Sequence, residues 1–123
     1  MPIVEQLWTY ERLLAEFPAE SRVELIHNEI YMPPAPSLEH QETVSELGFL
    51  LQSFVRNGVL GKVFYAPFDV LLDANTVVQP DIVFVRKTNL QVLTQRGCEG
   101  IPNLVVEIIS PSTFYRDSVE KFE

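Results

Sequence analysis

The sequence predicts an α/β domain in which a mixed β-sheet is flanked by helices and preceded by an N-terminal β-hairpin. Short runs of β-branched and aromatic residues alternate with stretches whose apolar residues follow the helical period. Near the N-terminus, residues 22–26 and 29–32 are both rich in strand formers, and His27 and Asn28 separate them as a two-residue turn. The chain has 123 residues, which suits one domain spanning residues 1–123.

Two helices are predicted before the central strands. The first covers residues 9–17, where apolar side chains recur at helical spacing and Thr9 can cap the N-terminus. The second is longer and covers residues 38–56, with Ser37 as its N-cap. Residues 57–58 are Asn-Gly, which is typical of the end of a helix, so we expect the second helix to end there.

The rest of the chain is predicted to be mostly strands. They are expected at residues 62–66, 68–72, 82–85 and 104–109. The last two are apolar on both faces, which predicts central positions in the sheet. The elements expected between and after them are a turn at residues 73–76, a short helix at 90–95 followed by a Gly-rich loop, and a final helix capped by Ser112.

The composition indicates a soluble cytoplasmic protein. Hydrophobic residues make up 46% of the chain and charged residues 21%, a globular balance that argues against disorder. No apolar run approaches the roughly 20 residues that span a bilayer, and the N-terminus lacks the pattern of a secretory signal. Cys98 is the only cysteine, so it cannot form an internal disulfide, and a reducing compartment fits best.

The charge is unevenly distributed. The formal net charge of −8 argues against binding nucleic acid through the whole surface. Residues 1–50 hold nine acidic and two basic residues, a net of −7, whereas residues 51–123 hold eight acidic and seven basic residues, a net of −1. Residues 51–123 could therefore still form a local cationic surface.

Two carboxylates are the main candidates for chemistry. Asp81 immediately precedes an apolar strand, and Glu107 lies within one, where a charged group is costly without a partner. If the two strands are neighbours, both carboxylates converge at one edge of the sheet and could bind Mg²⁺, which would polarise a phosphoryl oxygen and activate water. The structural alternatives are a turn-forming role for Asp81 and a buried salt bridge for Glu107.

Other polar residues have simpler explanations on their own. Lys121 lies one turn after Asp117, which predicts a solvated ion pair. Asp69 and Glu24 could face the same cleft, but a solvent-facing carboxylate on an edge strand is the commoner situation. His40 could contact a phosphate or relay a proton, although a single His there is usually just a polar helix residue. No Ser-His-Asp pattern, phosphate-binding Gly-rich loop or zinc-type cluster is present.

Five segments in order resemble the Uma-two family, a bacterial group of restriction endonucleases that is abundant in cyanobacteria. Together they cover nearly the whole chain, and their order is more specific than any one of them. The segments are residues 23–30 (VELIHNEI), 36–41 (PSLEHQ), 66–72 (APFDVLL), 79–85 (QPDIVFV) and 102–113 (PNLVVEIISPST), followed by Arg116, Asp117 and Lys121.

The resemblance implies a restriction-endonuclease-like core of the PD-(D/E)xK superfamily. Pro80 and Asp81 match the first half of that motif and Glu107 matches its central acid. Ile109 stands where the usual lysine would be, and Lys121 matches the family's relocated lysine on the following helix. The resemblance also favours Glu24 as an additional site acid.

The implied activity is hydrolysis of DNA phosphodiester bonds with Mg²⁺ or Mn²⁺ held by Asp81 and Glu107, and Lys121 orienting water or stabilising negative charge. A homodimer is expected because two symmetry-related sites cut two strands most simply. The family normally continues beyond the lysine-bearing helix with an aromatic-rich strand segment, which this sequence lacks.

Two other functions stay open at this point. One is a catalytically inactive module that still associates with DNA, which the acidic surface and the missing segment favour. The other is a protein-interaction or dimerisation domain that uses an open sheet edge and no nucleic acid.

Overall fold

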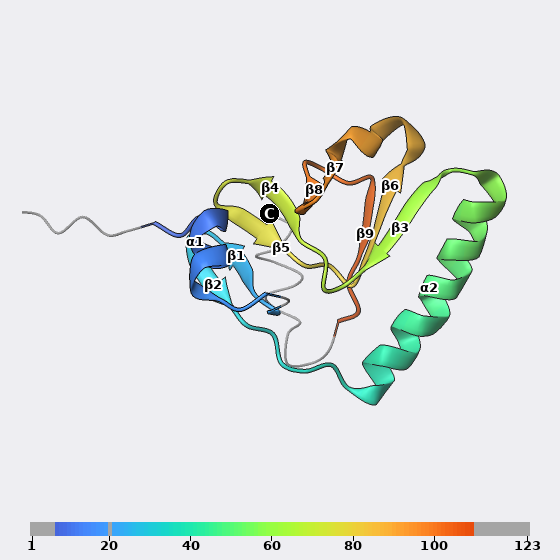
Figure 1. The fold of residues 1–123 in the computed structure, drawn as a ribbon. Helices are drawn as coiled ribbons and strands as arrows, with labels where there is room; N and C mark the ends of the chain where they lie inside the picture. Colours follow the sequence, from blue (N-terminus) through green and yellow to red (C-terminus); the bar gives the residue numbers. More distant parts are fainter. Residues whose placement is uncertain (1–6, 20, 110–123) are drawn as a thin grey trace, which may run out of the picture.

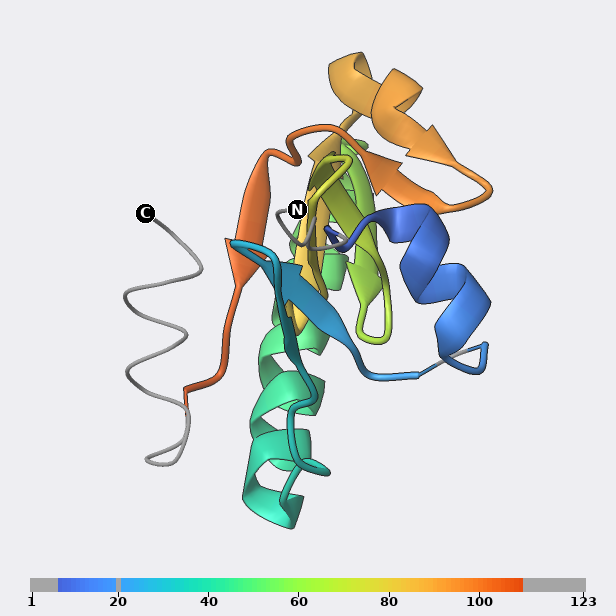
Figure 2. The same cartoon turned by 90° about the vertical axis from the view of Figure 1, so that its left-hand side faces the viewer.

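The computed structural model describes residues 7–19 and 21–109. Two β-sheets pack face to face, with one helix on the outside of each (Figure 1). The layers run from α1 (Tyr10–Glu16) through the larger and then the smaller sheet to α2 (Leu38–Gly58). In Figure 2, β9 (Leu104–Val106) lies along one side of the molecule and α1 along the other.

The larger sheet has six strands among the described residues. Their order is β2 (Glu29–Tyr31), β1 (Glu24–Ile26), β5 (Thr76–Val78), β4 (Val70–Asp73), β8 (Gly97–Glu99) and β7 (Leu93–Thr94). The β4–β8 pair is parallel and the other pairs are antiparallel, so the sheet is mixed.

The smaller sheet places β6 (Ile82–Arg86) between β3 (Gly61–Tyr65) and β9. Both pairs are antiparallel, with Ile82 opposite Tyr65 on one side and opposite Val106 on the other. β6 is thus the central strand that its apolar sequence predicts. Its side chains Ile82, Val83 and Val85 are fully buried, as expected of a strand covered on both faces.

The N-terminal hairpin is confirmed. β1 and β2 pair antiparallel, and His27 and Asn28 between them have φ values of 51° and 60°. Two consecutive left-handed residues match the right-handed twist of the strands, and Asn adopts this conformation more readily than most residues.

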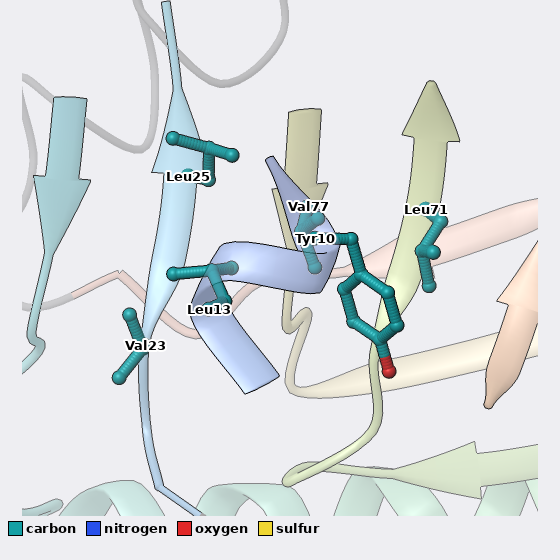
Figure 3. Packing of buried hydrophobic residues seen from close by; sticks show 6 residues of the cluster. All are labelled: Tyr10, Leu13, Val23, Leu25, Leu71 and Val77. Atoms are coloured by element: carbon teal, nitrogen blue, oxygen red, sulfur yellow. The ribbon is translucent and has the colours of Figure 1, made fainter. Parts of the chain in front are cut away.

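Helix α1 covers the outer face of the larger sheet. The Thr9 side chain accepts the N–H of Arg12, so the predicted cap is confirmed. Tyr10 and Leu13 pack against residues of β1, β4 and β5 and against Val23 (Figure 3). The helix therefore adds an apolar layer to that sheet, and the Tyr10 hydroxyl points out of the cluster beside β4.

Helix α2 packs against the smaller sheet. The Ser37 side chain accepts the N–H of His40, as expected of an N-cap. Val55 is buried against Val63 and Ile82, with Val44 and Leu51 beside them. The helix runs through Gly58, and Val59 (φ 51°) is the left-handed residue that ends it. The expected end at residues 57–58 is confirmed, although the helix runs two residues beyond the predicted Arg56, and the N–H groups of Val59 and Leu60 both return to carbonyls of the last turn.

The main core lies between the two sheets. It joins Val70 and Val78 of the larger sheet to Val83 and Val85 of the smaller one, and each of these side chains is at most 5% exposed. Cys98 is also fully buried there as a free thiol, and burial raises its pKa above the usual value. The lone cysteine thus belongs to the packing of the core.

Three predicted elements differ from the structure. The strand expected at residues 68–72 begins at Val70, and Thr76 belongs to β5 instead of the turn, because residues 76–78 pair with both β1 and β4. Residues 86–102 hold a 3₁₀ helix (Lys87–Val92) and the β7–β8 hairpin in place of a helix at 90–95 and a loop. A side chain on Gly97 would collide with the Asp69 carbonyl oxygen, so the hairpin depends on this glycine.

The last predicted strand is shorter than expected. β9 ends at Val106, and within the described residues it forms one edge of its sheet. Glu107 therefore follows the strand, because the Ile108 N–H bonds to the Asp81 side chain and leaves the backbone ladder. The predicted final helix from Ser112 lies outside the described residues. The fold class itself, a mixed α/β domain consistent with the restriction-endonuclease-like class, is confirmed.

We predict that Leu25→Ala lowers the free energy of unfolding by about 2–5 kcal/mol, because Leu25 is 0% exposed between α1 and β5 and its loss leaves a cavity. Urea unfolding followed by circular dichroism measures the change. The control is Leu38→Ala, at a side chain that is 75% exposed, which we expect to cost less than about 0.5 kcal/mol. Equal effects of the two variants would contradict the described core.

Candidate functional site

Antiparallel pairing of β6 with β9 brings the two candidate acidic residues to neighbouring positions. The register pairs Ile82 with Val106, and continuing it by one residue sets Asp81 opposite Glu107. The Asp81 Oδ2 atom accepts the N–H of Ile108 at 2.7 Å, so the chain just after Glu107 is held at the Asp81 side chain. The two strands are neighbours, as the metal-site hypothesis requires, and both residues lie at the same end of the smaller sheet.

Asp81 is buried, and each of its two oxygens has a different partner. It is 6% exposed, while Glu107 is half-buried. The Oδ1 atom lies 3.2 Å from Nε2 of His40, and Oδ2 accepts the Ile108 N–H. The Asp81 carbonyl also accepts the Ala66 N–H at 3.2 Å, which ties the residue to the end of β3. Asp81 therefore does more than shape a turn.

His40 contacts Asp81, although its sequence pattern favoured a role as a polar helix residue only. It lies in the first turn of α2, where the Ser37 cap fixes the backbone, and its side chain is 19% exposed. Its Nδ1 is buried and has no hydrogen-bond partner among the described residues. The contact with Asp81 joins residues 41 positions apart, and no local pattern in the sequence indicates it.

Glu24 is also buried close to this end of the sheets. It is 4% exposed on β1, which lies between β2 and β5, so the expectation of a solvent-facing acid on an edge strand is wrong. Its Oε2 accepts the N–H of Gln79 at 2.6 Å. Because Gln79 is two residues before Asp81, this bond positions the segment that carries the candidate metal ligand.

A second polar network extends from Gln79 to α1. The Gln79 Nε2 donates to Asp69 Oδ1 at 2.8 Å, and the Tyr10 hydroxyl donates to Asp69 Oδ2 at 3.1 Å. Burial, and secondarily the charge of Asp69, raises the pKa of Tyr10 to about 12. Asp69 therefore does not face solvent as an edge-strand acid; it joins α1 to the segment between β5 and β6.

The donor set fits a hard divalent cation. A carboxylate has about four lone-pair sites, and the contacts to His40 and Ile108 use one on each oxygen of Asp81. Mg²⁺ binds such oxygens through one or two carboxylates and keeps several waters. Within residues 7–19 and 21–109, no group of three or more His, Cys, Asp or Glu side chains could hold a metal ion. A cation bound by Asp81 and Glu107 would therefore have at most two of the described carboxylates as ligands and would keep several waters.

The remaining predicted site residue, Lys121, lies outside the described residues, as does its neighbour Asp117. In the described part of the chain, no helix is long and apolar enough to cross a membrane.

The fold is that of a mixed α/β domain, and Asp81 and Glu107 lie at the same end of its smaller sheet. A family model described as "putative restriction endonuclease", that of the Uma-two family, matches residues 7–123. The chain therefore belongs to the Uma-two family. Comparison with curated proteins finds no match.

We predict that Tyr10 makes stability fall at high pH. The folded-state pKa is raised from 10.0 to about 12, so the folded chain holds this proton more tightly than the unfolded chain does. Its contribution is complete below pH 10 and is lost as the pH rises toward 12. The free energy of unfolding should therefore fall more steeply for wild type than for Tyr10→Phe, by at most about 1.4 kcal/mol per pH unit.

Chemical unfolding at several pH values between 9 and 11.5 measures both curves. Tyr65→Phe is a matched control, because Tyr65 is 40% exposed and donates to the Gly48 carbonyl instead of a carboxylate. Parallel wild-type and Tyr10→Phe curves would refute the buried hydroxyl–carboxylate pair.

Proposed function

We propose that this chain is a metal-dependent endonuclease that hydrolyses phosphodiester bonds in DNA. The observation that carries the proposal is the bond between the Asp81 carboxylate and the Ile108 N–H, which holds the Glu107 segment at a buried carboxylate. Membership of a family described as restriction endonucleases supports nuclease chemistry for such a site. A carboxylate pair at one end of a sheet fits the metal-assisted hydrolysis that this chemistry uses.

Asp81 and Glu107 are the residues that would hold Mg²⁺ or Mn²⁺. A divalent cation bound by such carboxylates polarises a phosphoryl oxygen and lowers the pKa of water. The two carboxylates also place strong negative charge at this end of the sheet, which favours a divalent cation over a monovalent one. DNA phosphates would then bind where that charge is neutralised.

The neighbouring residues position these ligands. His40 and the Ile108 N–H contact the two oxygens of Asp81 and so restrict the orientation of its carboxylate. Glu24 holds the Gln79 backbone and is proposed as an additional site acid. Lys121 is proposed to orient the attacking water or to stabilise the negative charge that develops on the phosphate.

DNA as substrate requires a local cationic surface, because the net charge of −8 repels phosphates at long range. Basic residues are concentrated after residue 50, which is where such a surface would form. We further propose that two copies act together as a homodimer, since a two-fold axis would present one site to each DNA strand.

A second candidate function is a non-catalytic interaction domain of the same fold. The observation that favours it is an apolar stripe on the outer face of α2, formed by Leu47, Leu50 and Phe54, which are 37%, 62% and 68% exposed. Their i, i+3 and i+7 spacing places them on one side of the helix. A domain that served only to bind a partner would use this stripe and would not need the acidic site.

We predict that purified protein nicks supercoiled plasmid in the presence of Mg²⁺ or Mn²⁺, and that Asp81→Asn and Glu107→Gln each lower the rate about 100-fold or more. The substitutions keep the size of each side chain but remove the charge that a cation needs. Agarose-gel separation of supercoiled, nicked and linear forms measures the rate.

Asp73→Asn is the control, because Asp73 is an exposed aspartate at the end of β4 whose side chain accepts the N–H of Asn75. Its nicking rate should equal that of wild type, and chelation by EDTA should abolish both. Lys121→Ala should lower the rate while leaving Mn²⁺ affinity unchanged. Nicking that survives in both Asp81→Asn and Glu107→Gln would refute the proposed ligands, and the absence of any nicking would favour the interaction domain.

A further inference from the structure

The exposed cations that have no ion pair among the described residues gather at one end of the smaller sheet. The chain has nine Lys and Arg residues, of which Arg116 and Lys121 lie outside the described residues. Arg12 and Arg96 each pair with a Glu side chain, and Arg22 is half-buried with its Nε enclosed. The others form what we call the cationic patch, and within residues 7–19 and 21–109 none of them has an ion pair: Arg56, Lys62, Arg86 and Lys87.

Strand pairing and the end of α2 bring the cationic patch together. Arg86, the last residue of β6, is paired with Gly61, and Lys62 follows Gly61 on β3. The Lys87 N–H donates to the carbonyl of the residue before Gly61 at 2.9 Å. Arg56 lies in the last turn of α2, the helix that leads into β3. Figure 1 shows the end of α2, the start of β3 and the end of β6 beside one another.

A close backbone contact keeps the like charges of the patch near one another. A side chain on Gly61 would collide with the Val85 carbonyl oxygen, so β3 approaches β6 this closely because residue 61 is glycine. The same side chain would also meet the backbone of Arg86 and Lys87. Charges of one sign repel each other, and a ligand that carries several negative charges would relieve this repulsion.

The segments that carry the patch lack acidic residues. Residues 47–68 and 82–98 hold all of its cations and contain no Asp or Glu. Glu46 precedes the patch residue of α2 by about 15 Å of helix, which exceeds the Debye length of about 8 Å at physiological salt. Glu99 on β8 lies 3.9 Å from the Arg96 guanidinium, which compensates its charge. The patch is therefore a local positive surface on a chain whose net charge is −8.

A hydrogen-bonding amide lies beside these cations. The Asn103 Oδ1 accepts the N–H of Arg86 at 2.8 Å and the Nδ2 of Asn89 at 3.1 Å. Those two bonds fix the amide of this exposed residue, so its own NH₂ group is left for a ligand. Phosphate oxygens take charged contacts from Lys and Arg together with neutral donors such as Asn side chains. The patch therefore suits phosphate groups.

We propose that the cationic patch binds the phosphate backbone of duplex DNA and anchors it to one side of the scissile bond. Asp81 and Arg86 lie at opposite ends of β6, about 17 Å apart at roughly 3.4 Å per residue. That distance covers about five base pairs, so one duplex can reach both. Contacts to phosphates carry no sequence information, so the patch would be an anchor and would not read bases. The position relative to the scissile bond rests on the proposed function, whereas binding of DNA to the patch does not.

Fluorescence anisotropy of a labelled duplex of about 20 base pairs measures this binding, in EDTA so that no cleavage occurs. We expect Arg86→Gln combined with Lys87→Gln to reduce the slope of log affinity against log salt by about 1.8, or 0.9 for each lost phosphate contact. The control combines Arg12→Gln with Arg96→Gln, which changes the net charge equally at cations that are already paired. Its slope should match wild type. Equal effects of the two double variants, or no binding of the duplex by wild type, would overturn the proposal.

An anionic membrane is the other polyanionic surface that such cations attract, and vesicles that contain phosphatidylserine are the probe for it. We expect wild type to bind these vesicles no more tightly than the Arg86→Gln, Lys87→Gln variant does. Vesicle binding that depends on the patch, with duplex affinity unchanged in that variant, would overturn the proposal.

The kinetics of plasmid nicking test where the anchor lies. The Arg86→Gln, Lys87→Gln variant should raise KM several-fold and leave kcat unchanged, because a remote phosphate contact is equal in the ground and transition states. A fall in kcat at unchanged KM would overturn the placement away from the scissile bond. Asp81→Asn should lose nicking and keep the salt dependence of duplex binding. Duplex binding that depends on the patch, without any nicking by wild type, would refute the nuclease and leave the anchor standing.

Discussion

The hydrogen bond from the Ile108 N–H to the Asp81 carboxylate is the interaction on which the candidate site depends. It forms where β9 leaves the sheet, so the same bond ends the strand and brings the segment carrying Glu107 to a buried acid. The bond contributes to stability because Asp81 is only 6% exposed, and a buried carboxylate without a hydrogen-bond donor would be strongly destabilising. His40 contributes from α2, so three elements meet at one side chain.

A second set of polar contacts positions this site relative to the larger sheet. Glu24 holds the backbone of Gln79, whose side chain holds Asp69, which in turn accepts the hydroxyl of Tyr10. The chain between β5 and β6 passes from one sheet to the other at this point, and regular pairing cannot satisfy its backbone groups. Buried carboxylates take that role, which explains why acidic residues occur among strongly apolar strands.

Much of the fold follows from local patterns. Thr9 and Ser37 predicted the starts of both helices, and the His27–Asn28 turn predicted the hairpin, since capping and turn formation depend on a few adjacent residues. The hypothesis of a metal site required the strands beside Asp81 and Glu107 to be neighbours, and they are. The position of His40 against Asp81, the burial of Glu24 and the contacts of the half-buried Asp69 were not predicted, because they depend on which strands become neighbours. The early end of β9 could not be predicted either, because it depends on the Asp81 side chain, which accepts the Ile108 N–H from a distant part of the chain.

The most direct test of this account is the place where a divalent cation binds. Substoichiometric Mn²⁺ added to ¹⁵N-labelled protein broadens the amide signals of nearby residues. The account predicts selective broadening at Asp81, Ile82 and Ile108, with loss of the effect in Glu107→Gln. Broadening centred instead on the exposed acids of α2, such as Glu42 and Glu46, with the Asp81 signal unaffected, would contradict it.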